Sequence, residues 1–176
     1  MSLARRGAAL SLIAMCSLAG CATTARAPAD GATPWTSGRL SVRIESNPPQ
    51  SISAGFELRG NAESGELRLN SPLGSRLAAA RWSPGSAVLA DSQGEQRYAN
   101  LEDLSRRALG EALPLAALPD WLAGRPWPQA PHRDNQAGFE QLGWQVSLAR
   151  RAEGFVEASR AAPPPVLLRV KLDDPS

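Results

Sequence analysis

The chain has 176 residues, with 19 Lys and Arg, 17 Asp and Glu, one His and two Cys. Arg5 and Arg6 account for the basic excess, so the chain after position 20 carries 17 charges of each sign, which removes the simplest argument for a nucleic-acid partner. The 156 residues after position 20 suit a single domain.

The first 20 residues have the three zones of a signal peptide. Arg5 and Arg6 form the positive zone, residues 7–18 are almost wholly apolar or small, and Leu18-Ala19-Gly20-Cys21 closes the segment. The apolar run is shorter than the roughly 20 residues that a membrane-spanning helix needs. We therefore expect residues 1–20 to be a lipoprotein signal peptide.

The closing tetrapeptide resembles the lipobox of bacterial lipoproteins. The resemblance implies a diacylglycerol on the thiol of Cys21 and an acyl chain on its amine, with no other cofactor. Ala22 stands where Asp is the usual signal for inner-membrane retention, which implies the outer membrane, with the domain facing the periplasm. The alternative is an ordinary secretory signal followed by a chance Cys. With Cys16 removed and Cys21 acylated, no thiol remains for a disulfide or a metal.

Residues 21–34 contain the lipidated Cys and a segment without large apolar side chains. Such a segment cannot bury surface, so we expect a flexible tether. The folded part, residues 35–176, is expected to be one domain.

The dominant pattern after Trp35 is period-two alternation, which indicates strands with one buried face. It predicts strands over 39–45, 52–59, 66–70, 76–83, 86–91, 95–99, 138–149, 155–160 and 166–172. Ser92-Gln93-Gly94 is typical of a hairpin turn.

The pattern changes at Asn100, which with Asp103 predicts a helix that Gly110 ends. A second short helix is expected over 114–122, and three prolines between 126 and 131 predict irregular structure. The order of elements therefore predicts a mainly β fold: an antiparallel sheet, strongly curved or barrel-like, with helices on one side.

Catalytic patterns are missing from the sequence. The one His, His132, is expected in an irregular Pro-rich loop and is interpreted as a solvated side chain. No nucleophile elbow, phosphate-binding loop or metal-ligand spacing is present, and Glu102 and Asp103 are neighbours that face different ways on a helix. We expect no metal site and no enzyme, although carboxylates from distant strands could still meet.

Several motifs together resemble the LolB family. They are the lipobox, Gly38 to Arg43, Gly55-Phe56-Glu57-Leu58, Leu67 to Gly74, the hairpin Ala87 to Tyr98, the segment 115–124 with its Leu-Pro-Asp-Trp-Leu-Ala-Gly end, Gly143 to Val146, and Val166 to Asp173. The resemblance covers essentially the whole chain in the same order. It implies an unclosed antiparallel β-barrel, of about nine to eleven strands, wrapped around a short helical plug with an apolar cavity. Leu58 departs from the family, which often has Trp there.

The family resemblance also implies the function. The protein is expected to accept lipoproteins from the periplasmic carrier LolA by their acyl chains and to insert them into outer-membrane lipid, as a monomeric, non-enzymatic receptor and chaperone. The expected acyl-binding residues are inward-facing apolar side chains, which ordinary core packing would explain equally well. They are Leu40, Val42, Phe56, Leu58, Leu67, Leu69, Trp82, Leu101, Leu104, Leu118, Trp121 and Trp144.

Leu73 lies between Pro72 and Gly74 in a predicted turn, where side chains point to solvent. The family resemblance associates this loop leucine with membrane delivery, so Pro72, Leu73 and Gly74 are the expected membrane-insertion loop. The alternative is a leucine folded back on its own hairpin.

Two other functions stay open at this point. A structural or assembly lipoprotein would bind a protein partner and have a solid interior, whereas a lipid receptor would have a void of several hundred cubic ångströms. An envelope hydrolase would need two carboxylates from separate strands in one cleft.

Overall fold

The computed structural model describes residues 33–174. The expected signal peptide, Cys21 and nearly all of the tether lie outside the described residues. Within the described part, none of the helices is long and apolar enough to cross a membrane.

Six strands precede the helices and follow one another as hairpins. They are β1 (Thr36–Ile44), β2 (Gln50–Gly60), β3 (Gly65–Asn70), β4 (Arg76–Ser83), β5 (Ser86–Asp91) and β6 (Gly94–Tyr98). The β5–β6 connection is the turn expected at Ser92 and Gln93.

Helix α1 (Leu101–Leu109) begins and ends where the sequence predicts. The side chain of Asn100 accepts a hydrogen bond of 2.8 Å from the backbone N–H of Asp103, which satisfies one of the free donors at the helix start. Gly110 follows with a φ of 75°, a left-handed conformation that glycine adopts without strain. Arg106 pairs with Glu102 and Asp103 one turn earlier.

Helix α2 (Leu118–Leu122) is shorter than the expected 114–122. The preceding residues form tight turns, in which the N–H of Ala117 bonds to the carbonyl of Pro114 and that of Leu118 to Leu115. Leu115 therefore lies in the α1–α2 connection and not on the helix.

The second half of the sheet contains the strands β7 (His132–Asn135), β8 (Gly138–Gln141), β9 (Trp144–Ser147), β10 (Phe155–Arg160) and β11 (Val166–Leu172), with the short 3-10 helix η1 (Arg151–Glu153) before β10. Two expectations were wrong. The single strand predicted over 138–149 is the hairpin β8–β9, which turns at Leu142 and Gly143 with φ of 55° and 76°. His132, expected in an irregular loop, begins β7.

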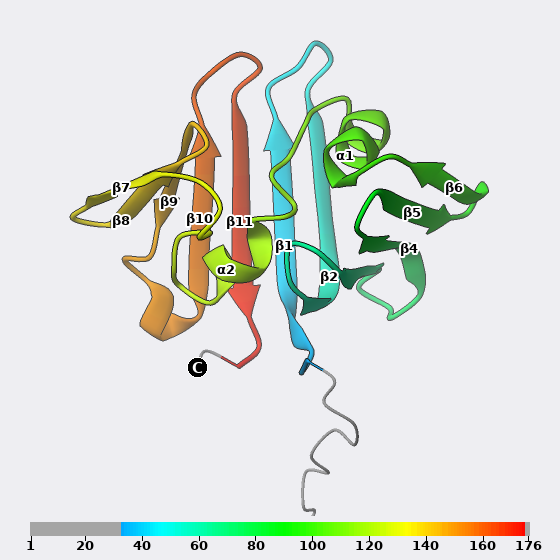
Figure 1. Cartoon of the computed structure of the whole chain (residues 1–176), viewed down its shortest axis with the longest axis horizontal. Coiled ribbons are helices and arrows are strands. Elements are labelled where there is room, and N and C mark those ends of the chain that lie inside the picture. The colour runs from blue at the N-terminus through cyan, green and yellow to red at the C-terminus, as the bar shows by residue number, and fades with distance from the viewer. Residues whose placement is uncertain (1–32, 175–176) are drawn as a thin grey trace, which may run out of the picture.

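All eleven strands form one antiparallel sheet in the order β6-β5-β4-β3-β2-β1-β11-β10-β9-β8-β7. The first and last strands of the chain pair at its centre, from Gly38 opposite Leu172 to Ile44 opposite Val166. Strands β6 and β7 do not pair with each other, so the barrel is open. Both helices lie in front of the same face: α2 over the long central strands, and α1 toward β5 and β6 (Figure 1). This confirms the expected unclosed barrel with a helical insertion.

The inward side chains of the sheet and the helices form one apolar core, which includes Ile44, Trp121, Phe139, Val146 and Leu172. Because strand residues alternate between faces, the outward positions are left for arginine, glutamate and serine. The curvature of the sheet places the apolar face on the helix side, where the candidate site lies.

Candidate functional site: an apolar cavity and an exposed loop

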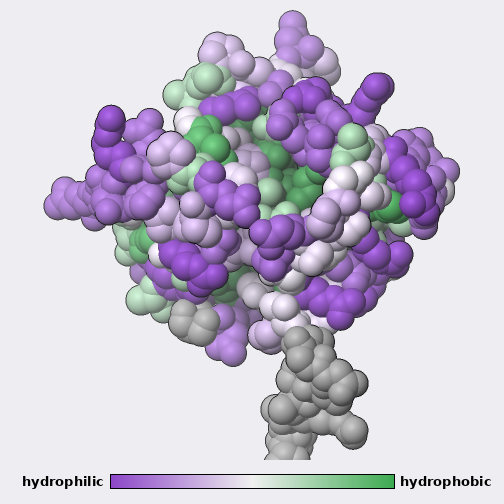
Figure 2. Space-filling view, viewed as in Figure 1, coloured by the Kyte–Doolittle hydropathy of each residue, from purple (hydrophilic) through white to green (hydrophobic). Residues whose placement is uncertain are grey.

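An apolar cavity of about 390 Å³ lies between the concave face of the sheet and the helices. Its wall comes from strands on both sides of the β1–β11 seam, from α1, from the α1–α2 connection and from α2. Figure 2 shows apolar atoms gathered in the middle of this face with polar side chains around them. The volume falls within the roughly 300–1,000 Å³ typical of ligand pockets.

The structure brings together eight of the twelve residues expected to line such a cavity. They are Leu40, Val42, Leu67, Leu69, Leu104, Leu118, Trp121 and Trp144. The other four, Phe56, Leu58, Trp82 and Leu101, are buried in the packed core and do not reach the cavity wall. Trp82 instead donates a hydrogen bond of 2.8 Å to the carbonyl of Asn61.

The cavity has further apolar lining residues outside the expected set. They include Ile52, Leu77, Leu89, Leu109, Leu113, Leu115 and Leu168. The alternation of the strands already placed Ile52 and Leu168 on the inner face. Leu115 belongs to the segment predicted as a helix, and it reaches the cavity although it lies in the α1–α2 connection. Leu113 precedes that predicted helix, and no periodicity indicates which face it buries.

Two tryptophans lie side by side in the cavity wall. The rings of Trp121 and Trp144 are 6.2 Å apart between centroids and tilted by 54°. The indole N–H of Trp121 points to the buried side chain of Gln141, which accepts a hydrogen bond of 2.8 Å. This arrangement leaves the indole's polar atom satisfied, so the rings present an apolar surface to the cavity.

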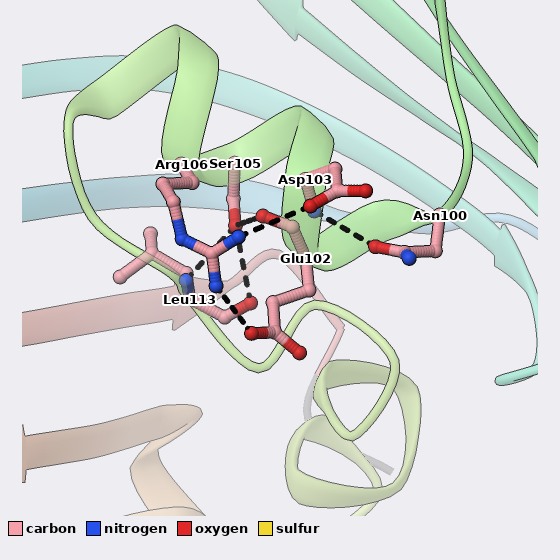
Figure 3. Close-up of polar contacts among 6 residues, drawn as sticks. All are labelled: Asn100, Glu102, Asp103, Ser105, Arg106 and Leu113. Carbon is pink, nitrogen blue, oxygen red and sulfur yellow. Dashed lines mark hydrogen bonds and ion pairs between the residues drawn. The ribbon is translucent and has the colours of Figure 1, made fainter.

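Helix α1 and the connection after it are joined through Ser105, which is 1 % exposed and lines the cavity. The hydroxyl of Ser105 accepts a hydrogen bond of 2.9 Å from the backbone N–H of Leu113 and donates one of 3.0 Å to the carbonyl of Glu102 (Figure 3). Glu111 in the same connection forms a half-buried ion pair of 2.8 Å with Arg160 of β10. The connection is thus attached to α1 and to the sheet.

The loop between β3 and β4 is closed by backbone hydrogen bonds from Ser71 to Ser75 (2.8 Å) and from Gly74 to Ser71 (2.9 Å). Pro72 and Gly74 are exposed, and the side chain of Leu73 is 93 % exposed. Leu73 is therefore not folded back on its own hairpin. A leucine held this far into solvent leaves an apolar contact open for a membrane or a partner.

The outer face of the sheet has grooves of comparable volume but different chemistry. The groove over β1, β10 and β11 is about 430 Å³, and Arg39, Glu157, Arg169 and Lys171 line it. Charged walls favour water over hydrocarbon, so the inner cavity is the apolar site. Within residues 33–174, no three His, Cys, Asp or Glu side chains come together as a metal site.

An open antiparallel barrel, with an apolar cavity under helices on its concave face, defines the class of half-barrel proteins with a pocket suited to an apolar ligand. The chain belongs to the LolB family: the family model "Outer membrane lipoprotein LolB" matches residues 34–173.

Curated relatives agree with this membership. Proteins named outer-membrane lipoprotein LolB from Bordetella petrii and Ralstonia nicotianae are 34% and 35% identical, over 83% and 80% of this chain and 81% and 75% of their own. The relative from Cupriavidus pinatubonensis is 32% identical over 98% of this chain and 89% of its own. The resemblance inferred from the motifs is confirmed.

Proposed function

We propose that this protein receives lipoproteins from the periplasmic carrier LolA by their acyl chains and inserts them into the outer membrane, without covalent chemistry. One observation carries the proposal: an apolar cavity of about 390 Å³ opens on the face that the helices cover, where a solid core would leave no room for a ligand. A structural lipoprotein has no use for such a void. The family name adds the setting, since its members are outer-membrane lipoproteins.

The physical need for such a receptor follows from the cost of exposing hydrocarbon. Each methylene exposed to water costs about 0.8 kcal/mol, so the three chains of a lipoprotein cannot cross the periplasm unprotected. A receptor that offers an apolar wall makes the transfer favourable without any bond being made or broken. The side chains expected to hold the chains are those that line the cavity, among them Leu40, Leu69 and Trp121.

The remaining parts of the proposal concern the anchor. Cys21 would carry the diacylglycerol and the acyl chain that hold the protein in the outer membrane, and Leu73 would enter the lipid during delivery. The protein would act as a monomer.

The decisive experiment compares two forms of one client lipoprotein. A triacylated client presented by the carrier should form a complex with this protein, and the same client with its acylated cysteine replaced should not. Equal binding of both forms would refute acyl recognition. In cells, depletion of this protein should leave lipoproteins in the periplasm, bound to their carrier.

A further inference from the structure

The position of Leu77 in the sheet does not follow the alternation of its own strand. On β4, Ala78 and Ala80 face the cavity, whereas Arg81 lies on the outer face, where it pairs with Glu66 at 3.6 Å. Strict alternation would place Leu77 outside with Arg81. Leu77 nevertheless lines the cavity.

A break in strand pairing explains this exception. Leu69 pairs with Ala78 and Asn70 pairs with Arg76, so Leu77 is an extra residue with no partner on β3. Such a bulge re-aims a side chain and bends the strand. Here it turns Leu77 from the outer face to the rim of the cavity.

Exposure places Leu77 at the mouth of the cavity, where the lining residues Ser92 and Ala108 are also exposed. Four large apolar side chains in residues 33–174 are exposed, namely Trp35, Leu73, Leu77 and Leu142, and only Leu77 of these lines the cavity. It is 46 % exposed, so it contacts both the cavity and the solvent.

The same hairpin therefore carries a graded series of leucines. Leu69 on β3 is half-buried in the cavity wall, Leu77 on β4 is 46 % exposed at its rim, and Leu73 in the loop between them is 93 % exposed. Polar lining comes from Asp91, which pairs with Ala78 on the neighbouring β5, and from Ser92 in the turn after it. Leu69, Leu77 and Leu73 thus form an apolar series on one hairpin, with exposure increasing from the cavity wall to the loop.

We propose that Leu77 is the positioning residue of the cavity mouth, over which acyl chains pass between the cavity and the membrane that Leu73 contacts. This inference rests on the proposed function, because it assumes that the cavity holds acyl chains. Leu77 contributes little to holding a chain that is already bound, since many other side chains line the cavity. Its role is to keep a departing chain in apolar contact during transfer.

Two readouts on the mature chain test this role. The first is binding of a fluorescent palmitate analogue to the chain with Cys21→Ala, so that its own acyl chains do not compete. The second is the rate at which the lipidated protein transfers a triacylated lipoprotein from its carrier into phosphatidylethanolamine–phosphatidylglycerol vesicles. Leu77→Ser is the test variant, and Leu142→Ser is the matched control, because Leu142 is 47 % exposed in the β8–β9 turn, away from the cavity.

Leu77→Ser should lower the affinity for the palmitate analogue by no more than about twofold, because it changes one of many lining side chains. It should slow lipoprotein transfer at least about fivefold, because the departing chain crosses a polar rim. Leu142→Ser should change neither readout. Deletion of Leu77, which restores regular pairing of β3 and β4, should slow transfer in the same way. Unchanged transfer by Leu77→Ser, or parallel loss of binding and transfer, would overturn the role. Failure of the wild type to bind the analogue would instead refute the proposed function, and this inference with it.

Discussion

The indole Nε1 of Trp121 donates a hydrogen bond of 2.8 Å to Oε1 of Gln141, and the two side chains are 1 % and 2 % exposed. The same amide accepts a bond of 2.9 Å from the backbone N–H of Trp127 and donates bonds of 2.8 Å to the carbonyls of Trp127 and Ala130. One side chain of β8 therefore fastens both α2 and the proline-rich segment after it to the sheet.

Replacement of this amide should destabilise the protein. We expect Gln141→Leu to lower the free energy of unfolding by about 3 kcal/mol, because an unsatisfied buried donor or acceptor costs about 1–3 kcal/mol and several are created. Urea denaturation measures the change. Gln145→Leu is the control, since Gln145 is exposed on β9 and bonds only to Asn135. Equal stability of the two variants would contradict the role of Gln141.

The sequence allowed most of the strands to be predicted, because alternation such as that of Leu40 and Val42 follows directly from one buried face. It did not reveal the β8–β9 turn. Leu142 adopts a φ of 55° there, although a leucine is rarely found in a left-handed conformation and is no turn signal. The surrounding sheet, and not local preference, holds Leu142 in place.

The sequence predicts which side chains face the inside of the sheet, but not which of them border a cavity. Ile52, Phe56 and Leu58 alternate on the same side of β2, yet Ile52 lines the cavity while the other two are packed in the core. What separates them is the tertiary position of the helices, including α2, which packs against β2. Local periodicity contains no information on that position, so a filled and a hollow interior look alike in sequence.

The carboxylate of Glu66 is buried on the outer side of β3 among three arginines. It accepts hydrogen bonds of 2.9 Å from Arg59 and 2.8 Å from Arg68, and the ring of Trp35 lies over both guanidinium groups. Burial raises the pKa of Glu66, but the hydrogen bonds and positive charges of Arg68 and Arg59 outweigh it, so the pKa lies below its ordinary value of 4.5.

The lowered pKa of Glu66 predicts the direction in which the stability of the protein changes with pH. The unfolded chain takes up the proton at a higher pH than the folded chain, so the contribution of Glu66 is present above pH 4.5 and is lost as the pH falls through the lower folded pKa. We expect Glu66→Gln to cost about 1–2 kcal/mol at neutral pH, less than for a fully buried pair because the arginines reach solvent.

The test is the unfolding free energy of wild type and Glu66→Gln measured from neutral pH into the acid range. The gap between them should narrow below pH 4.5. Glu95→Gln, which removes an exposed carboxylate 3.7 Å from Arg97, should change stability little at any pH. A gap that stays constant on acidification would show that the charge of Glu66 is not what stabilises the site.

Leu73→Glu should separate binding from delivery. The side chain is 93 % exposed, so the fold and the cavity should be unaffected. Insertion into vesicles should fall about tenfold or more, because a charge replaces a side chain whose burial in lipid is worth roughly 1.5–3 kcal/mol. Vesicle flotation of a labelled client measures the loss, and Leu142→Glu controls for an added surface charge. Normal insertion by Leu73→Glu would exclude a membrane role for the loop.

Filling the cavity at Ala78 should impair acyl-chain binding itself, which Leu73→Glu should leave intact. Ala78 of β4 is half-buried in the cavity wall, so a phenyl ring in its place would occupy space that an acyl chain needs. Ala90, on the neighbouring β5, pairs with Ala79 on the outer face and is also half-buried. Ala78→Phe should therefore weaken binding of a palmitate analogue about tenfold, whereas Ala90→Phe should leave it unchanged. Because both variants add the same ring to adjacent strands, a difference in affinity at equal thermal stability would assign the ligand to the inner face. Equal affinities would show that acyl chains bind elsewhere on the protein.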